Sequence, residues 1–141
     1  MERPPTASEV IELLGLEPHP EEGVYLLTPG TRSAMHRLPG DEVLHFYLGD
    51  PVEMLELMAD GRSRATILGP ALDRMTVQHV VPGGTWQGSR LVPGGAWALL
   101  GTTMAPGFSY DDYEAGSAEL ATLHPGRAEL IEVLLPDAGA P

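Results

Sequence analysis

Residues 30–49 read GTRSAMHRLPGDEVLHFYLG, and the spacing within this stretch decides the fold. A glycine opens it, His36 follows six residues later, Glu42 follows after another six, and a second glycine closes it seven residues further on. Glycine and proline turns start and end short strands, and alternate side chains of a strand point to one side. The pattern therefore places His36 and Leu38 on one face and returns Glu42 on the next strand.

Short β-prone runs continue on both sides of this stretch and are separated by turn residues. The turn at Asp60–Gly61 is a strong hairpin signal, since Asp-Gly favours the tight turn that joins two antiparallel strands. The expected strands are residues 24–28, 42–48, 52–58, 63–68, 76–81, 85–92 and 96–104. So many short strands with almost no room for helices between them predict an all-β sandwich or barrel.

Helical patterns flank the strands. Thr6-Ala7-Ser8-Glu9 fits a capping box and predicts a helix over residues 6–15, after a loose tail at residues 1–5. Residues 115–135 form a second helix-compatible segment, interrupted by proline. We therefore expect one domain over residues 1–141, with a barrel at 24–114 and short helices at both ends.

Composition excludes several classes of function. The 141 residues carry a net charge of -12 and no cysteine, so disulfides, thiol nucleophiles and thiolate metal sites are excluded. The acidic balance argues against nucleic acid, which requires a basic face. No apolar run approaches the ~18 residues of a membrane span, and the polar N-terminus does not look like a secretory signal. We expect a cytoplasmic protein with no membrane or nucleic-acid partner.

Three blocks of the sequence together resemble the cupin superfamily. They are residues 26–51, which run from LLTPG to GDP, the segment QHVVPGGTWQGSR at 78–90, and residues 95–114, which run from GAW to APGFSYDDYE. Their order is similar to that in a small RmlC-like cupin subgroup of bacteria and fungi. The resemblance implies a double-stranded β-helix, or jelly-roll barrel, and usually a homodimer. It also implies that His36, Leu38, Glu42 and Gln87 occupy the four positions that converge on one cavity.

These four positions leave three interpretations open. A weakly bound divalent metal held by His36, Glu42 and Gln87 is one, although an amide is a poor ligand and Leu38 stands where the resemblance implies a second histidine. An acid/base pair without cofactor is another, because a carboxylate beside an imidazole raises its pKa and orients it. The third is a buried polar cluster in which His36 and Glu42 only satisfy each other.

Other side chains are candidates for lining such a cavity. Aromatic faces and a few polar groups are typical of small-molecule sites, and arginine suits an anionic ligand group. The expected substrate-binding residues are Gln87, Gln78, Phe46, Trp86, Phe108 and Arg90. Tyr47 or Tyr110 would be a catalytic acid only if it faces the cavity.

The remaining histidines are expected to have structural or surface roles. His45 falls on the strand face opposite Glu42, and His79 falls with Val77 and Val81 on a core face. His19 and His124 lie beside prolines and are expected at the surface.

The leading functional expectation is an isomerase- or epimerase-like enzyme that transfers a proton on a sugar-like or other polar metabolite. His36 would be the base, Glu42 its partner and Gln87 a donor to the substrate. A metal-dependent cupin enzyme with a reduced ligand set is one alternative. A ligand-binding or sensing cupin without catalysis is the other. In each case the partner is a small molecule, and a homodimer is expected.

Overall fold

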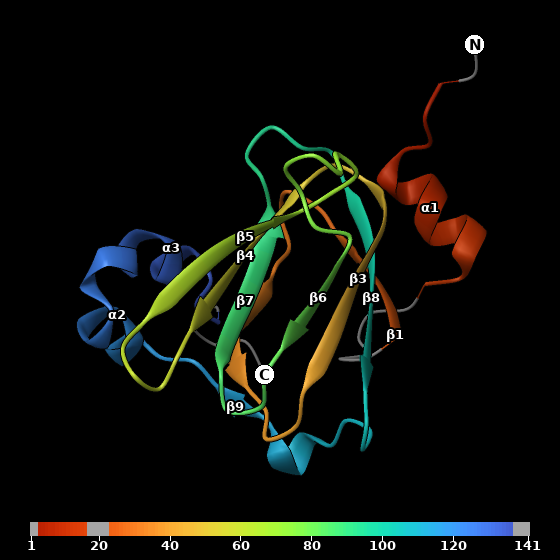
Figure 1. The fold of residues 1–141 in the computed structure, drawn as a ribbon. Helices are drawn as coiled ribbons and strands as arrows, with labels where there is room; N and C mark the ends of the chain where they lie inside the picture. Colours follow the sequence, from red (N-terminus) through yellow and green to blue (C-terminus); the bar gives the residue numbers. More distant parts are fainter. Residues whose placement is uncertain (1–2, 17–22, 137–141) are drawn as a thin grey trace.

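Residues 3–16 and 23–136 are described by the computed structural model, in which two antiparallel sheets face each other (Figure 1). One sheet has the order β1–β8–β3–β6, formed by Gly23–Leu27, Ala98–Met104, Glu42–Gly49 and Gln78–Val81. The other has the order β5–β4–β7–β2–β9, formed by Ser63–Leu68, Val52–Leu57, Trp86–Leu91, Ser33–Arg37 and Glu114–Ala115. The expected all-β jelly-roll architecture is confirmed.

The strands pair in nested order around the turn at Asp60–Gly61. β4 pairs with β5 on either side of this turn, then β3 with β6, β2 with β7 and β1 with β8. The chain is thus one long hairpin, and its two arms are folded over to form the two sheets. Because each pairing is antiparallel, alternate residues of every strand point into the space between the sheets.

Apolar side chains fill one half of that space. Val52 and Leu100 are completely buried there, between strands that belong to opposite sheets. The full cluster is Leu27, Leu44, Phe46, Val52, Met54, Leu68, Val81, Leu91, Ala98 and Leu100. Each Å² of apolar surface that this cluster removes from water stabilises the fold by about 25 cal/mol.

Two short helices cover the outer face of the β5–β4–β7–β2–β9 sheet (Figure 1). They are α2, Glu119–Leu123, and α3, Ala128–Val133, and they lie within the helical segment expected at residues 115–135. Leu120 and Ile131 from these helices pack with buried side chains of the strands in a second cluster, Met35, Leu55, Leu57, Leu120, Ile131 and Leu134.

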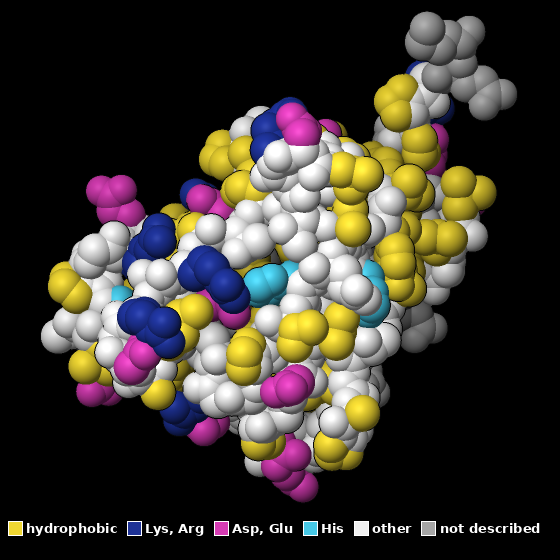
Figure 2. Space-filling model, viewed as in Figure 1, with side chains coloured by type: hydrophobic (Ala, Val, Ile, Leu, Met, Phe, Trp, Pro, Cys, Tyr) yellow, Lys and Arg dark blue, Asp and Glu magenta, His cyan; other side chains and the backbone are white. Residues whose placement is uncertain are grey.

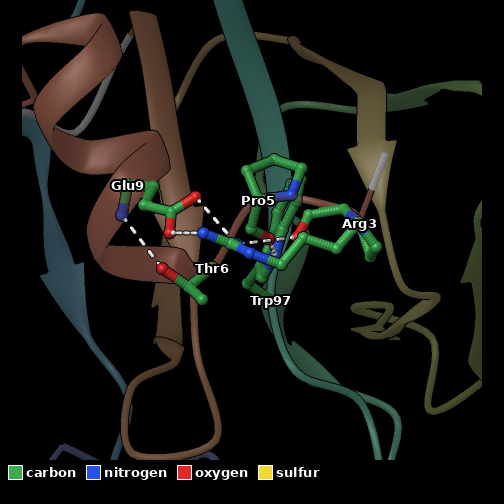
Figure 3. A network of polar contacts seen from close by, with 6 residues as sticks. Arg3, Pro5, Thr6, Glu9 and Trp97 are labelled. Carbon is green, nitrogen blue, oxygen red and sulfur yellow. Dashed lines mark hydrogen bonds and ion pairs between the residues drawn. The ribbon is translucent and has the colours of Figure 1, made fainter. Parts of the chain in front are cut away.

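The N-terminal helix α1, Ala7–Leu14, lies against the other sheet. The Thr6 hydroxyl accepts a hydrogen bond from the Glu9 amide at 3.3 Å, which is the expected cap. The Glu9 carboxylate pairs with Arg3 at 2.7 Å, and the Trp97 indole donates to the Pro5 carbonyl at 2.8 Å (Figure 3). Residues 3–5 are therefore held in place, in contrast to the loose tail expected there.

Two further expectations concern His19 and the absence of a membrane span. His19, expected at the surface, lies outside the described residues. No helix in the described ranges is long and apolar enough to cross a bilayer.

Candidate functional site

His36, Glu42 and Gln87 meet between the two sheets. His36 on β2 and Gln87 on β7 are register partners, and their side chains reach toward β3. The Gln87 amide nitrogen donates a hydrogen bond to Glu42 Oε2 at 2.8 Å. The three residues are only 5%, 4% and 4% exposed, in that order. The structure thus brings together the residues that the sequence singled out.

The His36 ring is oriented by the backbone. Its Nδ1 lies 2.7 Å from the carbonyl oxygen of Ala34, and a carbonyl can only accept a hydrogen bond, so Nδ1 carries the proton. In the neutral ring, Nε2 then carries the lone pair. This nitrogen lies 3.9 Å from Glu42 Oε2. The arrangement offers a proton acceptor beside a carboxylate.

Aromatic side chains from residues 108–113 cover this end of the barrel. The Tyr113 ring stacks on the His36 ring, with centroids 5.2 Å apart and planes 12° from parallel. Phe108 packs edge-on against Tyr110, with 4.8 Å between centroids. A hollow of about 30 Å³ lies beside them, lined in part by Leu38 and Phe108. A ligand as large as a sugar would have to displace some of these side chains.

A second polar cluster lies between the sheets, centred on Glu56 of β4. The carboxylate is fully buried, and its Oε1 lies 2.6 Å from His79 Nε2 and 3.1 Å from Arg64 Nη2. Burial alone would raise the pKa of the Glu56 carboxyl, but the hydrogen bonds and charges of His79 and Arg64 outweigh it and hold the pKa below its usual value. Glu56 is also the register partner of Gln87, so both clusters belong to one polar row.

Three of the expected substrate-binding residues do not line the space around His36. Gln78 lies on the exposed outer face, with its amide nitrogen 3.4 Å from His45 Nδ1. Trp86 also points outward, because it neighbours the inward Gln87, and it packs against the cluster under α2 and α3. Arg90 alternates outward as well and pairs with Glu53 at 3.2 Å.

The other expected substrate-binding residues lie nearer to His36. Phe46 faces inward but is part of the apolar core. Phe108 lines the small hollow at the barrel end, as a residue at the mouth would. Gln87 is in direct contact with Glu42.

The remaining tyrosines and histidines named in the sequence analysis lie away from the space around His36. Tyr47 is 49% exposed and stacks on His45 on the outer face, so it does not meet the condition set for a catalytic acid. Tyr110 is 63% exposed at the barrel end. His45 points away from Glu42, which confirms its expected face. His124, expected at the surface, is buried at the end of α2, where the helical segment folds back on itself.

A larger hollow of about 290 Å³ lies elsewhere, between the loops at residues 28–32 and 90–95. Arg90 and Arg32 line it, and neither His36, Glu42 nor Gln87 does. Arg32 donates to the Leu135 carbonyl at 2.6 Å, and Arg90 is paired with Glu53. Both guanidiniums are therefore engaged within the protein itself.

The residues around His36 do not fit a metal ion well. Leu38 is buried and cannot ligate, and Gln87 directs its amide N–H, rather than its oxygen, toward the Glu42 carboxylate. That leaves one imidazole and one carboxylate, where a catalytic metal normally has at least three good ligands. Among the described residues, no three histidine or acidic side chains converge on one point suited to a metal.

The cluster of Glu56, Arg64 and His79 is not among the sites expected from the sequence. A signal for it exists, because Glu56 alternates with Val52 and Met54 and therefore shares the core face of β4. A carboxylate on such a face requires buried partners. His79 lies on the core face of β6, as its alternation with Val81 indicates. On this face it contacts the Glu56 carboxylate of the opposite sheet.

Comparison with known proteins agrees with this architecture. The family model described as Cupin superfamily (DUF985) matches residues 24–116. No curated protein matches the sequence. A hypothetical protein from Leishmania major superposes with a TM-score of 0.83 at 26% identity, covering 94% of this chain and 100% of that one. A protein from Shewanella oneidensis gives 0.83 at 27% identity, covering 95% and 99%.

A more distant similarity extends to enzymes. A dTDP sugar isomerase from Desulfovibrio desulfuricans superposes with a TM-score of 0.57 at 17% identity, covering 76% of this chain and 71% of that one. At this identity the similarity concerns the fold alone. With the family model spanning the whole barrel, the chain belongs to the cupin superfamily, in the family described as DUF985.

Proposed function

We propose that the chain is an enzyme that moves a proton on a sugar-like or other polar metabolite, in an isomerisation or epimerisation. The observation that carries this proposal is the orientation of His36. Its Nδ1–H is held by the Ala34 carbonyl, which leaves Nε2 as the proton acceptor 3.9 Å from Glu42. General bases in enzymes are held in this way, with one ring nitrogen fixed and the other directed at the substrate.

Glu42 and Gln87 support the base. A carboxylate beside the imidazole stabilises the imidazolium that forms when His36 takes a proton. Gln87 holds that carboxylate through its own amide at 2.8 Å, so the carboxylate remains fixed while the charge on the ring changes. Tyr113 stacks on the ring and limits the access of water to it.

We expect replacement of His36 with asparagine to slow proton exchange by about 100-fold or more, the usual contribution of a general base. The measurement is the uptake of deuterium from D₂O into sugars and dTDP sugars, followed by NMR, after candidates have been selected by thermal shift. His45→Asn is the matched control, because His45 lies on the outer face of the barrel, against Tyr47 and Thr103. Because this face is also the dimer interface proposed below, sedimentation is used to check that His45→Asn keeps the wild-type mass, and the rate should then stay within about 3-fold.

Two results would favour the alternatives. About one equivalent of a divalent metal per chain, measured by elemental mass spectrometry and lost in His36→Asn, would favour metal-dependent chemistry. Ligands that stabilise the protein but show no deuterium uptake with wild-type protein would favour a binding or sensing module. Undiminished exchange in His36→Asn would exclude His36 as the base.

We also propose a homodimer formed through β3 and β6 on the outer face of the β1–β8–β3–β6 sheet, beside the part that α1 covers. Tyr47, Leu48 and Val80 are 49%, 60% and 50% exposed on or beside this face, and α2 and α3 lie on the opposite sheet. Exposed apolar side chains on one sheet face are typical of an interface. Sedimentation should give twice the mass of the 15.1 kDa chain, and Tyr47→Glu should shift it to the monomer. A wild-type monomer at all concentrations would contradict the proposal.

A further inference from the structure

The seam between β5 and β6 holds a group of charged side chains outside the His36 site. Among residues 3–16 and 23–136, β5 pairs with β4 and β6 pairs with β3, and Leu68 forms one isolated bridge with Thr76. These two strands are therefore edges of their sheets. Arg64 from β5 and His79 from β6 reach the same atom, Oε1 of Glu56. Figure 2 shows histidine, arginine and acidic side chains side by side on the face where these strands lie.

His79 Nε2 has two polar neighbours, Glu56 Oε1 and, at 3.4 Å, Arg64 Nη2. The 2.6 Å contact between Nε2 and a carboxylate oxygen that is ionised requires Nε2 to donate. The other nitrogen, Nδ1, contacts no polar group among the described residues, and it carries a lone pair when the ring is neutral and an N–H when the ring is charged. The side chain is 13% exposed, so this nitrogen belongs to a ring that solvent reaches at the seam. A carboxylate thus orients a second imidazole, and at a shorter distance than in the His36–Glu42 pair.

Arg64 supplies a positive charge next to this ring. It uses Nε and Nη2 on Glu56 Oε1, at 3.3 and 3.1 Å, while its side chain remains 52% exposed. Nη1 makes no polar contact within the described part of the chain and keeps its donors for another group. A guanidinium held at one edge and open at the other is suited to a phosphate or carboxylate.

A purely structural role explains only part of this arrangement. A cluster that bridges two edge strands stabilises the seam, and one pair of partners would suffice for that. The Glu56 carboxylate nevertheless directs both partners to Oε1 and leaves Oε2 buried without a hydrogen bond among the described residues. The imidazole and the guanidinium therefore lie side by side on the same oxygen. The atoms that do not contact it are Nδ1 of His79 and Nη1 of Arg64.

We propose that Arg64 and His79, oriented by Glu56, bind a small ligand that carries a hydroxyl group next to a phosphate or carboxylate. Arg64 binds the anionic group, and Nδ1 of His79 forms a hydrogen bond with the hydroxyl, which can donate or accept. This site shares a polar row with the His36 pair, but its ligand is bound by other residues, and the proposal does not rest on the reaction proposed for His36. The net charge of -12 disfavours general attraction of anions, so binding at this point requires a specific site.

The test is an NMR titration of the full chain labelled with ¹⁵N-histidine, with the His79 signals assigned by a His79→Gln variant. The probes are glycerol 3-phosphate, glycerate, ethyl phosphate and glycerol. We expect glycerol 3-phosphate or glycerate to shift the His79 ring nitrogens, and whichever binds more tightly identifies the anionic group. Ethyl phosphate, which lacks the hydroxyl, should bind about 10-fold more weakly, and glycerol should have no measurable effect.

Variants separate binding at this site from nonspecific attraction of anions. Arg64→Gln should weaken binding by about 10-fold or more, and Arg64→Lys should weaken it less. Arg62→Gln is the matched control, because Arg62 lies in the same hairpin but is 78% exposed and paired with Asp60. It should leave the affinity unchanged, as should His36→Asn, so that a failure of the reaction proposed for His36 does not affect this result.

Two outcomes would overturn the proposal. One is no response of the His79 signals to either hydroxylated anion up to concentrations on the order of 10 mM. The other is an equal loss of binding in Arg62→Gln and Arg64→Gln, which would indicate nonspecific charge. A thermal melt of each variant shows whether it is folded, so a lost signal is attributed to binding only in folded protein.

Discussion

Replacement of Glu56 with glutamine should lower the free energy of unfolding by about 2–3 kcal/mol. The substitution keeps the shape of the side chain but removes the negative charge that Arg64 and His79 share between the sheets. Breaking a fully buried ion pair costs about 3–5 kcal/mol. The value expected here is smaller because the Arg64 side chain is half exposed and recovers part of its hydration. Urea unfolding of both proteins measures the difference.

The same comparison has a characteristic dependence on pH. The pKa of Glu56 is lower in the folded protein than its usual value, so its contribution to stability is present above the unfolded pKa of about 4.5. That contribution is lost as the pH falls through the folded value. The difference between wild type and Glu56→Gln should therefore be largest near neutrality and shrink in acid.

A surface pair provides the control for this prediction. Glu114→Gln removes an equal charge from a pair with Arg37 whose side chains are 56% and 37% exposed, and it should cost less than about 1 kcal/mol. If Glu56→Gln loses no more stability than Glu114→Gln at neutral pH, the cluster does not hold the seam.

Replacement of Gly49 with alanine should cost about 3 kcal/mol or more. Gly49 has φ of +104°, where residues with a Cβ are strained. A Cβ there would also press against the Trp97 carbonyl oxygen and lie 2.9 Å from the Trp97 ring. Backbone cannot move aside as a flexible side chain does, so the strain and the overlap add. Thermal or urea unfolding of the variant checks the value.

The glycine at the other end of the same motif is the matched control. Gly30 lies outside the left-handed region, and a Cβ there would meet nothing within 4 Å. Gly30→Ala should change the stability by less than about 0.5 kcal/mol. If Gly49→Ala loses no more stability than Gly30→Ala, a small shift of Trp97 relieves the overlap at Gly49, and the prediction is wrong.

The fold could be predicted because turns and strands are local features. Asp60–Gly61 marks the innermost hairpin, and the glycines and prolines after each run mark the ends of the other strands. The resemblance to the cupin motifs implied that His36 and Gln87 would lie beside Glu42, and the structure brings these three side chains together. Their roles in catalysis remain a proposal.

The placement of other candidate residues could not be predicted so well. The sequence pattern places Gln78 in the cavity and His79 in the core, as if these were two different sides of the strand. In a two-layer barrel the core side and the cavity side are the same, and the other side faces solvent or a helix. His79 therefore faces Glu56 and Gln78 faces outward. The contact between His79 and Glu56 joins residues 23 positions apart and depends on the curvature of both sheets, which no local pattern specifies.

The nested pairing of the strands has a consequence for the order in which the protein can form during synthesis on the ribosome. The β4–β5 hairpin can close once residue 68 has emerged from the ribosome, but β1 must wait for β8, whose Thr102 pairs with Gly23. Leu27 and Leu100 share one core cluster, so the first strand keeps its apolar side chains uncovered until nearly the whole barrel has emerged. We therefore expect folding to proceed from the middle of the chain outward, and β1 to be the segment that chaperones can bind for longest.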